Sequence, residues 1–209
     1  MDPVHFTDYN RTLPQLEATA LFSVLVAGKA AIPTARALDR LLINAKEYIN
    51  TKAHRPFKIL ELCNRITISN LLLQSGIGCH TAKGRAVYEL VHSGLDLRTC
   101  SVEDLEGIYG IGPKTSRFFV LHTRPNQQLA VLDVHLLRFL RDWGHTVPAV
   151  TPSSTRRYKE IERTVLWHAN EARMSPAEFD LMVWNRYREL RPGSRSLVSF
   201  GSDRKTNGT

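Results

Sequence analysis

The chain has 209 residues, of which 43% are hydrophobic and 23% are charged, a composition typical of one or two globular domains and unlike that of a disordered chain. With 28 lysines and arginines against 20 aspartates and glutamates, the net charge of +8 favours polyanionic partners. The three cysteines, Cys63, Cys79 and Cys100, lie too far apart for a CxxC pair or a cluster of metal ligands. Structural zinc and a disulfide framework are therefore not expected.

The longest apolar run, residues 18–28, is too short to cross a bilayer and lacks the features of a secretory peptide. We therefore expect no membrane partner and an intracellular setting, either cytoplasm and nucleoid or nucleus. The net charge is +3 in residues 1–60, +1 in 61–140 and +4 in 141–209. If the partner is a nucleic acid, basic residues from both ends of the chain should converge on it, while solvated helix faces are the alternative explanation.

Apolar residues recur at helical spacing along most of the chain, which predicts an all-α fold of about nine helices. The expected helices cover residues 13–27, 34–49 and 57–73, then a stretch that ends at about residue 92, and then 101–107, 115–123, 134–143, 153–172 and 175–190. Ser101 with Asp104 forms a variant of the capping box, and Asp133 is an expected N-cap. Residues 129–132 are strand-like but too isolated to build a sheet, and 192–209 are expected to be a flexible tail.

Two of the short helices are joined by a glycine-rich loop, in the sequence Ile-Tyr-Gly-Ile-Gly-Pro-Lys-Thr at residues 108–115. Gly110 and Gly112 allow a tight turn, and we expect Ile111 to plug inward and hold the helices together. The N–H groups of the loop and the N-terminus of the following helix then form an anion site that fits a nucleic-acid phosphate. A tight helical hairpin without a ligand is the alternative.

Lys114 and Asp133 are the residues best suited to chemistry. Lys114 falls in the first turn of the second hairpin helix, where the helix dipole favours the neutral, nucleophilic amine. Asp133 begins the next helix, where the same dipole favours the carboxylate. Such a pair suits departure of a base from a sugar, because positive charge develops at the anomeric carbon and a covalent imine can follow. The alternatives are a phosphate contact for Lys114 and a simple helix cap for Asp133.

Together these motifs carry a family resemblance. Residues 108–116 followed by 131–138 resemble the helix-hairpin-helix DNA glycosylases of the endonuclease III superfamily, whose pattern is an apolar residue, a Gly-Val/Ile-Gly hairpin, a lysine and threonine, and then Val-Asp-x-His. Further stretches resemble the end of the family's early helix, a DNA-facing loop and the last core helix, and these are residues 24–29, 78–83 and 177–187. The resemblance covers most of residues 15–190.

The resemblance implies that the hairpin lysine, Lys114, attacks the anomeric carbon and that Asp133 assists. It also implies two helical lobes with a DNA-binding cleft between them. Residues 30–125 would form a helical barrel that contains the helix-hairpin-helix motif at about 101–123, and residues 1–29 with 126–191 would form the second lobe. The implied DNA-binding residues are Gly110, Ile111, Gly112, Thr115, Lys29, His80 and Lys83.

The sequence departs from the family pattern at several points. Tyr109 stands where proline is usual and Ser116 where alanine is usual, which could alter the stiffness of the loop. No cysteine follows Cys100, so the four-cysteine iron-sulfur loop of many members is missing and we expect neither a cofactor nor a metal. Lys29 occupies what resembles the position of the gap-filling glutamine. Lys29 and His80 are candidates for filling the gap, against plain surface charge and loop polarity.

The pocket for the base is not assigned by the sequence. Trp143, Trp167, Trp184 and Phe179 could stack on an extruded base, but aromatic residues at helical spacing more often belong to the core. His135 follows Asp133 at a family-like position, and a structural hydrogen bond is the expected role.

The leading hypothesis is a monomeric base-excision repair enzyme, a DNA glycosylase with AP lyase activity on an oxidised or otherwise damaged base in duplex DNA. Both 8-oxoguanine and an oxidised pyrimidine fit this hypothesis. One alternative is a non-catalytic helix-hairpin-helix DNA-binding protein, and another is a monofunctional glycosylase in which water attacks. The pairing of Lys114 with Asp133 favours the first hypothesis over a binding module, which needs neither residue.

Overall fold

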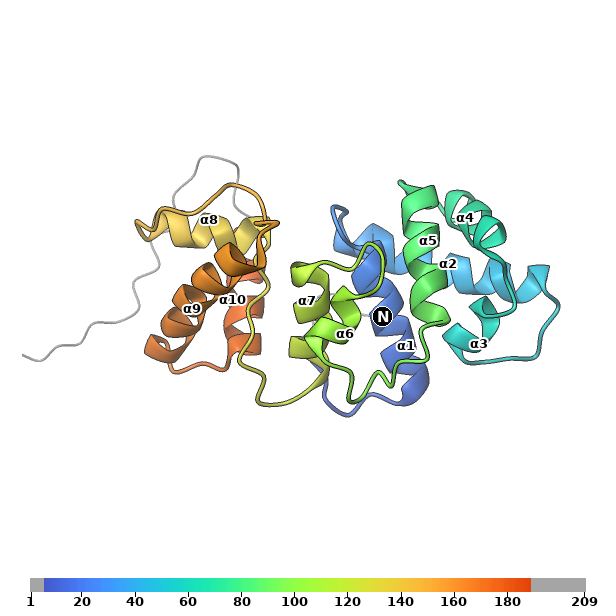
Figure 1. Ribbon diagram of the computed structural model, residues 1–209, viewed down its shortest axis with the longest axis horizontal. Coiled ribbons are helices and arrows are strands. Elements are labelled where there is room, and N and C mark those ends of the chain that lie inside the picture. Colours follow the sequence, from blue (N-terminus) through green and yellow to red (C-terminus); the bar gives the residue numbers. More distant parts are fainter. Residues whose placement is uncertain (1–5, 189–209) are drawn as a thin grey trace, which may run out of the picture.

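The computed structural model describes residues 6–188, and every regular element in this part of the chain is a helix (Figure 1). The all-α prediction is therefore confirmed. The elements are α1 (Leu13–Leu25), α2 (Ala31–Tyr48), α3 (Pro56–Leu60), α4 (Arg65–Gln74), α5 (His80–Val91), α6 (Val102–Glu106), α7 (Pro113–Thr123), α8 (Val134–Asp142), α9 (Thr155–Glu171) and α10 (Pro176–Arg188). The expected flexible tail, 192–209, lies outside the described residues.

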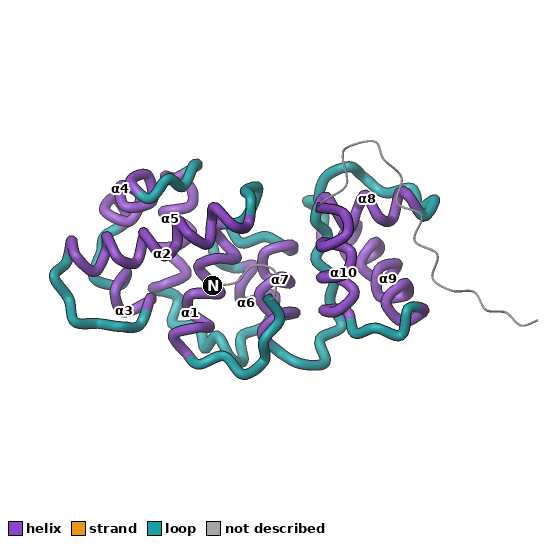
Figure 2. Tube along the Cα trace, turned by 180° about the vertical axis from the view of Figure 1, so that it is seen from behind, coloured by secondary structure: helices purple, strands orange, loops and turns teal. Residues whose placement is uncertain are grey.

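The helices form two lobes, each with its own hydrophobic core. Helices α1–α7 gather in one lobe and α8–α10 in the other, as the views from the front and from behind both show (Figures 1 and 2). Buried apolar residues from Phe6 to Val120 form the first core, and those from Ala130 to Tyr187 form the second. A small cluster of Leu121, Val131 and Ala177 lies where the lobes meet.

Helix α1 does not belong to the lobe that the family resemblance implied. Residues 1–29 were expected to join the C-terminal helices, but α1 packs against α2, α3, α5 and α7 in the first lobe. Its residues from Thr19 to Leu25 are all buried, together with Leu16 and Glu17. A helix that is covered on nearly every side must run through a lobe, and only the first lobe has enough helices to surround it.

The expected helix at residues 57–73 is also wrong, because the structure divides it into α3 and α4. Asn64 lies between them with an extended backbone, and its side chain accepts a hydrogen bond from the amide of Thr67 at 2.9 Å. An asparagine N-cap starts a new helix, which the apolar spacing alone did not reveal. The capping box of Ser101 and Asp104, in contrast, is confirmed.

No helix within residues 6–188 combines the length and the apolar character that a membrane-spanning helix requires.

Candidate active site

The hairpin between α6 and α7 has the predicted geometry. Gly110 adopts a left-handed backbone with φ of +78°, and a Cβ added there would lie only 3.1 Å from the Cβ of Ala86. Ile111 is 5% exposed and points into the first core, as expected. Gly112 is the N-cap of α7 with an extended backbone, and a Cβ added there would meet no atom within 4 Å. A side chain at residue 112 would therefore point into open space, whereas one at residue 110 would crowd Ala86.

The amides at this turn are available to an anion. Within residues 6–188, no acceptor takes a hydrogen bond from the backbone N–H of Gly110, Gly112 or Lys114. These donors lie at the N-terminus of α7, where the helix dipole adds partial positive charge. Such a turn fits a phosphate oxygen, which supports the anion site predicted from the sequence.

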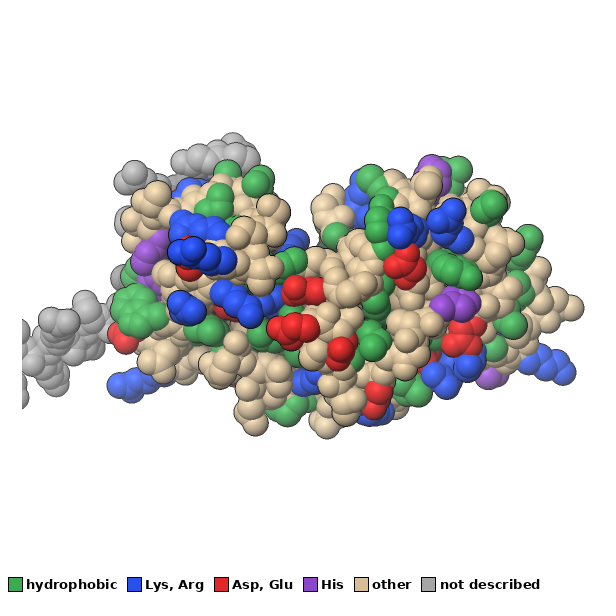
Figure 3. Space-filling view, in the orientation of Figure 1, with side chains coloured by type: hydrophobic (Ala, Val, Ile, Leu, Met, Phe, Trp, Pro, Cys, Tyr) green, Lys and Arg blue, Asp and Glu red, His purple; other side chains and the backbone are tan. Residues whose placement is uncertain are grey.

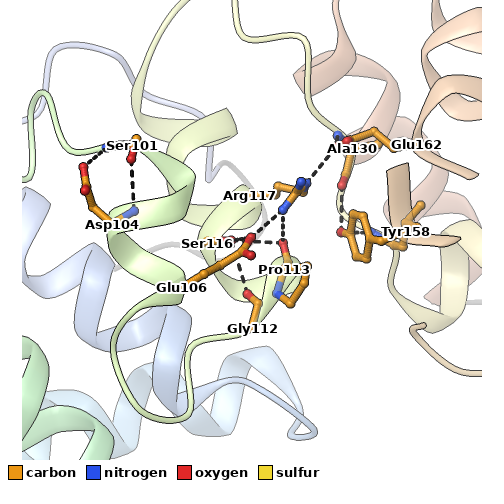
Figure 4. A network of polar contacts seen from close by, with 11 residues as sticks. Ser101, Asp104, Glu106, Gly112, Pro113, Ser116, Arg117, Ala130, Tyr158 and Glu162 are labelled. Carbon is orange, nitrogen blue, oxygen red and sulfur yellow. Dashed lines mark hydrogen bonds and ion pairs between the residues drawn. The ribbon is translucent and has the colours of Figure 1, made fainter. Parts of the chain in front are cut away.

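Both departures from the family's hairpin pattern have a structural role. The amide of Tyr109 donates a hydrogen bond to Glu89 on α5 at 3.0 Å, a bond that proline could not make. The guanidinium of Arg85 covers the ring of Tyr109, 3.8 Å from its centroid. Ser116 is buried, and its hydroxyl donates to Glu106 at 3.0 Å (Figure 4), a bond that alanine would lose. The two residues fasten the loop to α5 and α6.

Lys114 and Asp133 line the same cleft, which has a volume of about 590 Å³. Lys114 comes from the first turn of α7 in one lobe, and Asp133 is the N-cap of α8 in the other. Lys29 and Thr115 line the cleft as well. The surface is indented between the two lobes (Figure 3), and the cleft draws its residues from both of them.

Asp133 is both a helix cap and a cleft residue. Its Oδ1 accepts hydrogen bonds from the amides of His135 at 2.9 Å and Leu136 at 2.8 Å. Burial and the nearby Asp180 raise the pKa of the Asp133 carboxyl, and the Leu136 amide and Lys114 only partly offset this rise. Burial and a second carboxylate therefore oppose the helix dipole, which by itself favours the charged form of Asp133.

No protein-family model matches the sequence. Among solved structures, the 8-oxoguanine glycosylase/lyase of Methanocaldococcus jannaschii in complex with a 15mer DNA containing 8-oxoguanine superposes with a TM-score of 0.64 at 18% identity, covering 92% of this chain and 88% of that one. The 8-oxoguanine DNA glycosylase of Thermotoga maritima gives a TM-score of 0.63 at 22% identity, covering 84% of this chain and 80% of that one. This chain has the 8-oxoguanine glycosylase fold.

Within this glycosylase fold, α10 contributes cleft residues that the sequence did not assign. Asp180 and Trp184, one helical turn apart, both line the cleft. Asp180 is held from behind by His122, whose Nε2 lies 3.1 Å from Oδ2, while the other ring nitrogen lies 2.7 Å from the hydroxyl of Thr7. The sequence signal that could have indicated Asp180 was an acidic residue on a helix that packs into a core.

The other aromatic candidates for the base pocket lie outside the cleft. Phe179 belongs to the second core, and Trp143 and Trp167 lie outside the cleft. His135 was expected to make a structural hydrogen bond, and the structure places it in the lining of the cleft. Trp184 is thus the one indole of the described residues that an extruded base in this cleft could contact.

Lys83, an expected DNA-binding residue, lies away from the surface. Its side chain is buried, and its ammonium donates to the backbone carbonyls of Leu25 and of Ala27, the latter at 3.1 Å. It therefore caps the C-terminus of α1, where the helix dipole favours a cation. Burial, with a smaller contribution from Lys29, lowers the pKa of Lys83. This contact could not be read from the sequence, because it joins parts of the chain that are far apart in sequence.

His80 and Lys29 have different positions in the glycosylase fold. His80 is the first residue of α5 and is half-buried, and it does not line the cleft. Lys29 is exposed at the edge of the cleft, and its Nζ would lie 3.0 Å from a Cβ added at Gly78. Of the two gap-filling candidates, only Lys29 lines the cleft. Its contact with DNA stays a prediction.

Proposed function

We propose that this protein is a DNA glycosylase with associated AP lyase activity that removes an oxidised base from duplex DNA. One observation carries the proposal, which is that Lys114 and Asp133, drawn from different lobes, line one cleft. The free amides of the hairpin adjoin Lys114, so a phosphate bound there would bring the DNA backbone to the nucleophile. The 8-oxoguanine glycosylases of similar fold support the same activity.

The reaction follows from the two side chains. The target nucleotide must leave the duplex, because its anomeric carbon is shielded in the stack. Nζ of Lys114 forms a bond to that carbon while the glycosidic bond breaks, and the bonding electron pair leaves with the base. The Asp133 carboxylate stabilises the positive charge that develops on the sugar. The nitrogen then loses one proton, which the departing base takes up, and the bond from the anomeric carbon to the ring oxygen breaks as that oxygen gains a proton from water. This gives a protonated imine, from which loss of a proton at C2′ expels the 3′ phosphate and cleaves the strand by β-elimination.

Two residues of the cleft support a guanine-type base over a pyrimidine as the substrate. Trp184 offers a flat surface for stacking, and a carboxylate oxygen of Asp180 can accept from neighbouring donors. The Watson–Crick edge of a guanine-type base presents two adjacent N–H donors, whereas an oxidised thymine presents one. We therefore expect 8-oxoguanine to be the better substrate, and Asp180→Asn to lower that preference, measured as the ratio of single-turnover rates on the two lesions.

Borohydride trapping tests the proposal directly. Duplexes carrying 8-oxoguanine, an oxidised pyrimidine or no lesion are incubated with the protein and borohydride, and covalent adducts are separated by size. The wild-type protein should form an adduct with the 8-oxoguanine duplex, and Lys114→Gln should form none. Lys52→Gln removes the same charge from an exposed loop and serves as the matched control. Undiminished trapping by Lys114→Gln would eliminate the assignment of the nucleophile.

The same experiment separates the alternatives. Base release without an adduct would indicate a monofunctional glycosylase in which water attacks. Tight binding of the duplex without base release would indicate a DNA-binding protein that uses the hairpin alone.

A further inference from the structure

A buried ion-pair network links the hairpin to the second lobe (Figure 4). Arg117, on α7, is 2% exposed, and its guanidinium contacts Glu106 on α6 at 2.7 Å and Glu162 on α9 at 2.8 Å. It also lies over the ring of Tyr158 on α9, 4.6 Å from the centroid. Burial opposes its charge, but the two glutamates outweigh this effect and raise the pKa of Arg117. The three elements α6, α7 and α9 therefore meet at one cation.

The same α9 side chains hold the segment that leads to Asp133. Residues 127–132 have no regular structure, so their backbone polar groups need side-chain partners. Glu162 accepts from the amide of Ala130 at 3.0 Å, and the hydroxyl of Tyr158 donates to the carbonyl of Ala130 at 2.9 Å. That hydroxyl also accepts from the amide of Leu132 at 3.0 Å, and Thr151 donates to the Leu132 carbonyl at 2.7 Å.

These contacts form a continuous path between the two proposed reacting groups. Lys114 lies one helical turn before Arg117 on α7, and Asp133 directly follows Leu132. We propose that Arg117, Glu162 and Tyr158 are positioning residues that set the location of the Asp133 carboxylate relative to the Lys114 amine. None of the three lines the cleft, so they act through the backbone rather than on the substrate. The inference rests on the proposed glycosylase function.

Two tyrosine substitutions isolate this role. Tyr158→Phe removes only the hydroxyl that holds residues 130 and 132, and it keeps the ring that packs against Arg117. Tyr187→Phe removes a hydroxyl from the same core, one that donates to Asp142 at 3.0 Å. Tyr158→Phe therefore loses hydrogen bonds to the segment before Asp133, whereas Tyr187→Phe loses one to Asp142.

The expected result is a loss of rate without a loss of binding. Tyr158→Phe should lower the single-turnover rate of base release at least about tenfold, because displacement by a fraction of an ångström is costly to a reacting pair. Its affinity for an uncleavable lesion duplex should stay within about twofold, and Tyr187→Phe should keep the wild-type rate. Arg117→Lys, which keeps the charge but loses the two-sided contact, should lower the rate in the same way.

A double-mutant cycle distinguishes positioning from general stabilisation. If Tyr158 acts by locating the carboxylate, Tyr158→Phe should have almost no further effect in an Asp133→Asn protein. Provided that the wild-type protein is active, two results would overturn this inference alone. One is an equal loss of rate on Tyr158→Phe in both backgrounds, and the other is a Tyr158→Phe protein as fast as the Tyr187→Phe protein. A wild-type protein without any base release would overturn the proposed function, and this inference with it. Thermal unfolding of each variant verifies that the assays compare folded proteins.

Discussion

Replacement by alanine should destabilise the protein at Gly110 but not at Gly112, the two glycines of the hairpin. Gly110→Ala forces a left-handed backbone on a residue with a side chain, which costs about 1–2 kcal/mol, and it adds a close contact to Ala86. In Gly112→Ala, a reduced entropy of the unfolded chain stabilises by about 0.4–1 kcal/mol, and the poorer N-cap offsets a similar amount. The folded state should therefore lose stability only in the first variant.

The Gly112→Ala substitution should instead weaken DNA binding. The Cβ at residue 112 would point into open space, where a phosphate must approach the free amides. Loss of a hydrogen bond to a charged group costs about 1.5–3 kcal/mol, so the dissociation constant of Gly112→Ala should rise at least about tenfold. The slope of log affinity against log salt should stay almost constant, because no cationic side chain is removed.

Urea unfolding and fluorescence anisotropy of a labelled lesion duplex measure these two quantities. Thermal melting provides a second measure of stability, since about 1 kcal/mol shifts the melting temperature by about 2–4 °C at this chain length. A Gly112→Ala protein that binds with wild-type affinity would refute the hairpin as the DNA anchor. A Gly110→Ala protein as stable as the wild type would refute the strain at that turn.

Three further changes test individual contacts. Lys83→Met should lower the free energy of unfolding by about 1–3 kcal/mol in urea, because the carbonyls at the end of α1 lose a charged donor, and an effect on DNA affinity alone would contradict this. Asp133→Asn should abolish most base release and yet raise stability at neutral pH. The raised pKa of the carboxyl means that its stabilising contribution is present at low pH and is lost as the pH rises, so the gain should vanish on acidification. Burial and His145 lower the pKa of His168 to about 4, so stability should fall between about pH 6.5 and pH 4, and His168→Phe should reduce that dependence in urea titrations.

Local features of this protein were predictable, and contacts between distant segments were not. The hairpin, the capping box of Ser101 and the cap at Asp133 each depend on neighbouring residues, and all three are present. The cap at Asn64 had an equally local signal, but an uninterrupted apolar spacing concealed it. The role of Lys83 depends on where α1 ends in space, which no spacing along the chain reveals.

The candidate site divides in the same way. Lys114 and Asp133 follow from helix termini and from a family pattern, so the sequence indicated both. Asp180 reaches the cleft only because α10 packs against α7 and α8, and its effect on the pKa of Asp133 is a tertiary one. The raised pKa of Asp133 could therefore not be inferred from its own helix alone.

The division into two cores has a consequence for how this protein loses activity. Lys114 is fixed by the first core and Asp133 by the second, and the contacts of Arg117 and His122 are among those that join the lobes. Partial opening between the lobes would separate the reacting groups while both sets of helices stay folded. On heating, base release should therefore disappear at a lower temperature than helical circular dichroism, and hydrogen exchange should first increase at the amides of residues 130 and 132.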